Sequence, residues 1–208
     1  MRGGVIRAQW RRVGRVIVVG PVLVGGLIAL AGCAAGSAWP LVQAMTMVSW
    51  AAQIFVICVG VCVAVAVTGD PLIELHEATA VGFRLVLIVR AGILAVSGVI
   101  GAVVMFAPLH AVRVWPRDEG WISVVVPVGA VLIVAVVAVA ASAFAGTVSA
   151  TTIAVVAAWM FLAMIWDPYV LPLFAQRGLP LIAAAGMLLV AWRRLGDAEA
   201  NIAKVAAA

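Results

Sequence analysis

The chain has 208 residues, of which 67% are hydrophobic and only 10% are charged. Soluble domains carry about a quarter charged residues, so this composition excludes an ordinary soluble protein. The net charge is +5, and the basic residues lie beside apolar segments, which is typical of contact with anionic lipid and not with nucleic acid. The sequence therefore predicts an integral membrane protein with a lipid partner and no nucleic-acid partner.

Six apolar stretches recur along the chain, and crossing a bilayer takes about 20 such residues. Continuously apolar stretches favour helices over a β-barrel. The predicted fold is one all-α transmembrane domain, residues 1–208, with six transmembrane helices. These cover residues 16–37, 47–67, 85–107, 121–144, 151–166 and 179–192.

The positions of the basic residues predict the orientation. Most of them lie before the first stretch, between the second and third, or after the sixth, whereas only Arg113, Arg117 and Arg177 fall on the other side. The positive-inside rule then predicts cytoplasmic N- and C-termini in the cytoplasmic (inner) membrane. Trp159 lies mid-span, away from both interfaces, and is expected to pack between helices. The tryptophans expected at the outer ends are Trp39, Trp50, Trp115, Trp121 and Trp166, and those at the inner ends are Trp10 and Trp192.

The first stretch contains Pro21, which is expected to bend it, and the pair Gly32 and Gly36, whose spacing permits close helix approach. In the second stretch Thr46, Ser49 and Gln53 share one helical face. This face could line a substrate path, although hydrogen bonding to a neighbouring helix is the simpler interpretation.

The sequence predicts no metal site. Cys58 and Cys62 are one turn apart and could in principle hold a soft metal. Small buried thiols are the favoured interpretation. His76 and His110 are predicted on opposite sides of the membrane.

No catalytic residue and no cofactor on this chain are predicted. There is no phosphate-binding loop of the Walker type, and the only lysine is Lys204. All carboxylates, Asp167 included, are predicted at or beyond the ends of the spans, which does not favour ion-coupled transport. Any use of ATP would have to occur on another polypeptide.

The segment between the second and third stretches begins with Asp70 and Pro71, which together predict the start of a helix over residues 69–83. Glu74 and Glu77 are three residues apart within it. This helix could offer an acidic side to a cytosolic protein. The alternative is an ordinary solvated turn.

The same segment carries a family resemblance. Asp-Pro-Leu-x-Glu-Leu-x-x-Ala-Thr, from Asp70 to Thr79, followed by Arg84, resembles the loop between the second and third spans of ABC-2 type transporter permeases. Six spans with inward termini, the basic amphipathic segment at 1–15 and the basic segment at 192–199 are also similar to that family. Ala80 departs from it, because proline is common at this position.

The resemblance implies the permease subunit of an ABC-2 type exporter, which moves a hydrophobic or amphipathic substrate. The implied partners are a nucleotide-binding ATPase subunit, which holds ATP and Mg, and a second permease chain, identical or sibling. Residues 1–15 would form an amphipathic interfacial helix, and residues 69–83 a cytoplasmic coupling helix. The implied ATPase-coupling residues are Asp70, Glu74, Leu75, Glu77, Ala78 and Thr79. The alternative is a non-transporting membrane scaffold or accessory subunit.

In such permeases the link between the last two spans often forms short re-entrant helices. Residues 166–180 would suit this, because they are apolar yet broken by Pro168, Pro172 and Gly178. Non-helical backbone at membrane depth must be covered by protein. A simple surface loop is the alternative.

Overall fold

The computed structural model describes residues 14–68 and 83–196, and these parts are all-helical. Six helical units in them are long and apolar enough to cross a membrane. Length and composition thus indicate a multi-pass membrane protein. The helices are α2 (Arg15–Ala38), α3 (Leu41–Val67), α5 (Phe83–Ala111), α6 (Val125–Ala145), α7 (Val148–Met160), α8 (Asp167–Tyr169) and α9 (Leu173–Arg194). A 3₁₀ turn, η1 (Trp121–Val124), precedes α6, and a π-helical stretch, η2 (Phe161–Trp166), joins α7 to α8.

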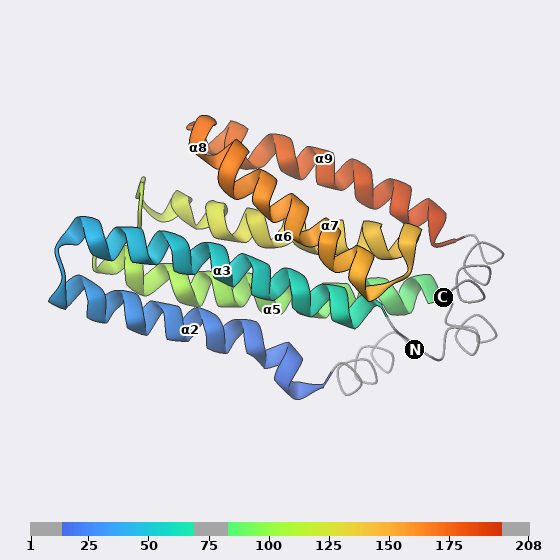
Figure 1. Cartoon of the computed structure of the whole chain (residues 1–208), viewed down its shortest axis with the longest axis horizontal. Coiled ribbons are helices and arrows are strands. Elements are labelled where there is room, and N and C mark those ends of the chain that lie inside the picture. The colour runs from blue at the N-terminus through green and yellow to red at the C-terminus, as the bar shows by residue number, and fades with distance from the viewer. Residues whose placement is uncertain (1–13, 69–82, 197–208) are drawn as a thin grey trace.

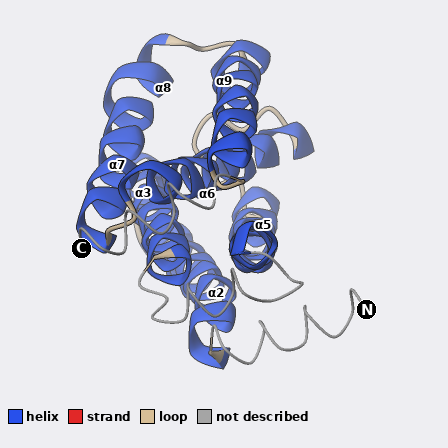
Figure 2. Cartoon of the chain, turned by 90° about the vertical axis from the view of Figure 1, so that its right-hand side faces the viewer, coloured by secondary structure: helices blue, strands red, loops and turns tan. Residues whose placement is uncertain are grey.

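The long helices lie side by side and alternate in direction (Figures 1 and 2). One end of the bundle, on the right in Figure 1, holds the start of α2, the end of α9 and the turn at residues 146–147. We call it the near end. The opposite end, called the far end, holds the connections at residues 39–40, 112–120 and 170–172.

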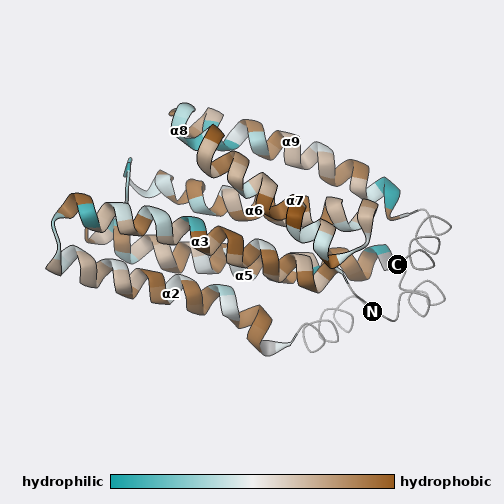
Figure 3. Cartoon of the chain, viewed as in Figure 1, coloured by the Kyte–Doolittle hydropathy of each residue, from teal (hydrophilic) through white to brown (hydrophobic). Residues whose placement is uncertain are grey.

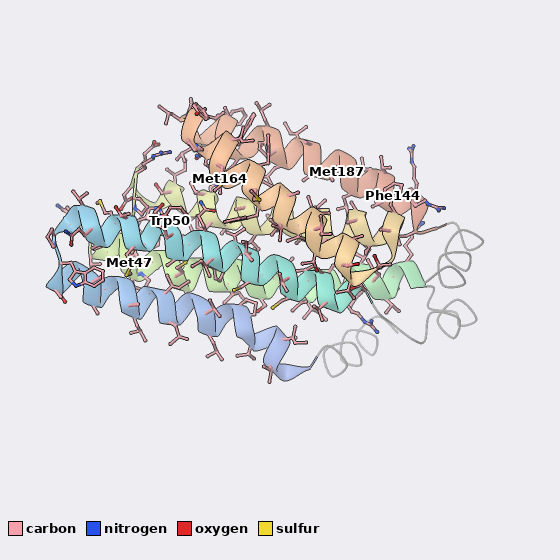
Figure 4. The ribbon with its side chains drawn as sticks, viewed as in Figure 1. Met47, Trp50, Phe144, Met164 and Met187 are labelled. Atoms are coloured by element: carbon pink, nitrogen blue, oxygen red, sulfur yellow. The ribbon has the colours of Figure 1, made fainter. Side chains whose placement is uncertain are left out.

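Helix α6 is the central helix. Of its apolar stretch 61% is buried, against 17% for α7 and for α9. Its buried residues Val131 and Val134 belong to the same core cluster as Phe55 and Val59 of α3 and Leu94 of α5. Apolar residues run along all the long helices, as the brown parts of the ribbon in Figure 3 show, and many large apolar side chains are exposed. Met164 and Met187 are among them (Figure 4), which suits contact with lipid.

Helices α2 and α5 approach closely through glycines. A Cβ atom on Gly25 would clash with the carbonyl of Gly101, and one on Gly101 would lie 2.5 Å from the carbonyl oxygen of Pro21. Gly32 and Gly36 also face α5 and its extension, against Leu109 and Val114. The close approach that the Gly32–Gly36 spacing permits is therefore present, as part of a longer series of glycines.

The first turns of α2 bend, as Figure 1 shows, and Pro21 lies there. Proline has no N–H to donate to the preceding turn. Ser97 of α5 donates a hydrogen bond from its hydroxyl to the carbonyl of Val18. This bond satisfies a carbonyl in the bent turn and ties α2 to α5.

Residues at the helix ends explain several boundaries. Gly146, with φ 70°, ends α6 in the left-handed conformation that glycine adopts readily. Thr147 then caps α7, because its hydroxyl accepts a hydrogen bond from the Ala150 N–H at 3.4 Å. Pro40 and Pro172 stand immediately before α3 and α9.

The second, third, fifth and sixth membrane-crossing units are longer than the sequence predicts. Helix α3 begins at Leu41 and not at 47, and α5 covers Phe83–Ala111 and not 85–107. The fifth unit covers Val148–Tyr169 and not 151–166, and α9 begins at Leu173 and not at 179. The link at 166–180 is helical except for residues 170–172. Its two arms continue directly into the fifth and sixth membrane-crossing units. The re-entrant arrangement of this link stays a prediction.

Two sequence predictions fall outside the described residues. They are the amphipathic helix at 1–15, of which only Gly14 and the start of α2 are described, and the coupling helix at 69–83, of which only Phe83 is described. The residues concerned in the second are Asp70, Glu74, Leu75, Glu77, Ala78 and Thr79.

Candidate functional site

A cavity of about 510 Å³ lies in the far half of the bundle, between α3, α6, the α7–η2–α8 unit and α9. This volume is within the range of small-molecule sites, about 300–1,000 Å³. Its wall mixes apolar side chains with hydroxyl, amide, indole and charged groups. The lining residues include Thr46, Ser49, Trp50, Gln53, Val56, Trp115, Arg117, Glu119, Ala130, Trp159, Leu162, Asp167, Gln176 and Arg177.

The polar face of α3 forms one wall of this cavity, since Thr46, Ser49 and Gln53 all line it. The Thr46 hydroxyl donates to the Val42 carbonyl of its own helix at 2.8 Å. Gln53 Oε1 accepts a hydrogen bond from the Trp159 indole N–H at 3.2 Å. The face therefore lines a cavity and also forms a hydrogen bond to a neighbouring helix, whereas its role in a substrate path stays a prediction.

Trp159 lies on α7, half-buried and packed against the main core. The expectation that this mid-span tryptophan packs between helices is confirmed. Its bond to Gln53 also gives the buried indole N–H the partner that it needs.

Opposite α3, the wall contains a buried ion pair. Only 2% of the Arg177 surface is exposed. Its guanidinium holds both carboxylate oxygens of Asp167, with Nη1 2.5 Å from Oδ1 and Nη2 2.7 Å from Oδ2. Nε donates to the Val126 carbonyl of α6 at 2.9 Å. This forked contact is one that arginine makes and lysine cannot.

Gly129 provides the space for Arg177. A Cβ atom at this position of α6 would lie 2.9 Å from Arg177 Cδ. The arginine stem therefore passes over the α6 backbone where no side chain stands. Packing and pairing together allow a charged residue in the interior of the bundle.

The backbone beside Asp167 is the centre of a polar network. The Asp167 carbonyl accepts hydrogen bonds from Arg117 Nη1 at 3.1 Å and from Gln176 Nε2 at 3.3 Å. The Gln176 carbonyl accepts from the Trp166 indole at 2.9 Å. Pro180 stands four residues after Gln176 in α9 and has no N–H to donate to the Gln176 carbonyl. The Asp167 carbonyl lacks a helical partner because α8 ends at Tyr169. The network joins the α8–α9 turn to α6 and to the far-end connection.

A cluster around His110 holds that connection. His110 Nδ1 lies 2.6 Å from Asp118 Oδ2, and the imidazole stacks on Phe106 with ring centroids 5.3 Å apart. Trp121 packs edge-on against both rings. Arg117 has a φ of 53°, a strained value for a residue with a side chain. The cluster thus fixes the connection that brings Arg117 to the cavity.

The ion pair corrects one sequence prediction. Arg177 is predicted in the outer connection, yet it lies inside α9. Asp167 lies in the last turn of the fifth membrane-crossing unit, at a span end as predicted. A signal was present, because these two are the only charged residues between 148 and 192. Two lone opposite charges in an apolar stretch are expected to pair.

The cavity wall carries groups that could bind a ligand. Hydroxyl, amide and indole groups can hold a ligand by hydrogen bonds and packing. Within the described ranges, no three His, Cys, Asp or Glu side chains gather in a group that could hold a metal ion. No protein-family model, curated protein or solved structure matches this chain.

Proposed function

We propose that this chain is the permease subunit of an ABC-2 type exporter, which works with a separate ATPase subunit to move a hydrophobic or amphipathic substrate across the cytoplasmic membrane. The cavity carries the proposal. It lies between membrane-crossing helices, and its mixed wall suits a molecule that is partly polar and partly apolar. Two permease chains, identical or sibling, would form the complete pathway.

The distribution of charge supports an orientation with the near end in the cytoplasm. Among the described residues the near-end charges are all arginines: Arg15, Arg84, Arg90, Arg193 and Arg194. At the far end, Arg177 is neutralised by Asp167, which leaves Arg113 and Arg117 beside Asp118 and Glu119. More of the described arginines therefore lie at the near end, and the positive-inside rule favours that end as the cytoplasmic one. The cavity would then open in the outer half of the membrane.

The connection between α3 and α5 supports the place of the ATPase. Its described flanks, Thr68 and Phe83, lie at the near end, and its residues carry the resemblance to the permease coupling loop. The chain has no phosphate-binding loop of its own. ATP hydrolysis by a partner subunit bound at this end would thus drive transport.

Cysteine labelling tests the orientation. With Cys33, Cys58 and Cys62 replaced by alanine, we expect a membrane-impermeant maleimide to label Val112→Cys on intact cells. Ser149→Cys, exposed at the near end, should react only after permeabilisation. The reverse pattern would refute the orientation, and labelling of both sites after permeabilisation confirms that each is reactive.

Copurification tests the partner. A P-loop ATPase encoded next to this chain, when coexpressed with it, should copurify with the wild type in detergent. Glu74→Arg should abolish copurification, because it reverses a charge in the proposed contact. Arg113→Glu, a charge reversal at the far end, is the matched control and should keep the ATPase. An ATPase retained equally by both variants would exclude the proposed contact, and a stable complex without transport would favour the scaffold alternative.

A further inference from the structure

The charges in the cavity wall cancel. Arg177 is held by both carboxylate oxygens of Asp167, and its Nε is occupied by the Val126 carbonyl. The exposed side chains Arg117 and Glu119 add one charge of each sign. Neither sign is therefore in excess. Arg117 and Glu119 stand on the exposed far-end connection, so a ligand with a net charge between α3, α6 and α9 would lose its hydration without gaining an unpaired counter-charge there.

The α3 side of the wall offers hydrogen-bond donors. An indole N–H can only donate, so Trp159 fixes the orientation of the Gln53 amide with Oε1 toward the ring. The two N–H donors of Gln53 Nε2 then have no acceptor among the described residues. The Ser49 hydroxyl likewise has no hydrogen-bond partner in the described part of the chain. The Gln53 amide N–H groups can only donate, and the Ser49 hydroxyl can donate as well as accept, so this wall favours acceptors on the ligand.

The rest of the wall is apolar and partly aromatic. The indole of Trp159 lies beside Gln53, and Trp50 lines the same cavity one residue after Ser49. Val56, Ala130 and Leu162 supply aliphatic surface from three different elements. Indoles pack well against flat rings. The apolar part of a ligand would be accommodated here.

From these features we infer that the cavity binds an uncharged amphipathic molecule with a ring-containing apolar body and hydrogen-bond acceptors such as carbonyl, sulfonyl or ether oxygens. This inference rests on the proposed function, for which it names the substrate class. Gln53 and Ser49 are the residues that select the acceptors. The paired Asp167 and Arg177 keep the opposite wall neutral.

Three fluorescent probes with one ring system test the charge preference. N-propyl dansylamide is neutral and has sulfonyl acceptors, dansyl sulfonate is an anion, and dansylcadaverine is a cation. Energy transfer from tryptophan to each probe is titrated on the purified chain in nanodiscs, with empty nanodiscs as the blank. We expect the Kd of the neutral probe to be at least about tenfold lower than that of either charged probe. Equal affinities would overturn the inference.

Two substitutions locate the binding. Ser49→Phe should raise the Kd of the neutral probe about tenfold by filling the cavity. The matched control is Ile54→Phe, on the same helix at an exposed position that does not line the cavity; it should leave the Kd unchanged. Equal effects of the two variants would place the binding elsewhere.

Gln53→Glu tests whether Gln53 contacts the ligand, because a purely structural role would leave the order of the probe affinities unchanged. The substitution keeps an acceptor for Trp159 but removes both amide donors and adds a negative charge. At about pH 8, far above the usual pKa of Glu, the preference should shift from the neutral probe toward dansylcadaverine. An unchanged order of affinities would contradict the role of Gln53. These titrations need no ATPase. If the probes bind without the expected preference while the ATPase still copurifies with the chain, only the ligand class is refuted. Binding without any ATPase contact refutes the exporter.

Discussion

Replacing Arg177 with methionine is expected to destabilise the folded chain by about 3–5 kcal/mol, the usual cost of removing one partner of a buried ion pair. The substitution leaves the Asp167 carboxylate, whose side chain is 13% exposed, without its counter-charge. It also removes the donor to the Val126 carbonyl. A large fall in Tm, measured by size-exclusion chromatography after heating in detergent, would check this.

Two further variants separate pairing from packing. Arg177→Lys retains the charge but not the fork, so its loss should be smaller than that of Arg177→Met. Asp167→Asn combined with Arg177→Met should recover part of the stability, because no unpaired charge remains. If Arg177→Met melts at the wild-type temperature, the pair does not hold the α8–α9 turn against α6.

The second large effect is expected at the crossing of α2 and α5. Gly101→Ala places a methyl group 2.5 Å from the Pro21 carbonyl oxygen. The two nearest atoms, the oxygen and the carbon of that carbonyl, belong to the α2 backbone, so the two helices must separate to make room. Overpacking of this kind costs about 1–3 kcal/mol and sometimes more. The melting temperature of Gly101→Ala in detergent should therefore fall by several degrees.

Gly92→Ala is the matched control for this prediction. Gly92 lies in the same helix, and a Cβ atom there meets nothing within 4 Å. Alanine is the better helix former, so this variant should be neutral or slightly more stable. Equal losses at the two positions would show that the close approach contributes nothing particular.

The six membrane-crossing helices could be predicted from the sequence because lipid imposes one rule on every span, namely a long uncharged stretch. The same rule explains the error at the start of α9. It counts Arg177 as a break and so begins the predicted sixth stretch late, whereas in the fold Asp167 offsets that charge and α9 runs through it. Pairing between spans does not enter a count of hydrophobic residues.

The candidate site could be predicted only in part. The shared face of Thr46, Ser49 and Gln53 follows from helical periodicity, which the sequence contains. The cavity that this face lines depends on how α6 and the α7–η2–α8 unit pack against α3, and no local pattern encodes that. Gly129 illustrates the limit, since among 20 glycines only the packed structure shows which one accommodates an arginine.

The most direct test of the central claim is ATP hydrolysis by the complex of this chain with its copurified ATPase in nanodiscs. Adding N-propyl dansylamide should stimulate hydrolysis in the wild type and in Ile54→Phe. Ser49→Phe, with its cavity filled, should hydrolyse ATP at the basal rate with no stimulation. Hydrolysis that ignores the probe in the wild type, or that Ser49→Phe stimulates fully, would contradict a permease whose cavity is coupled to an external ATPase.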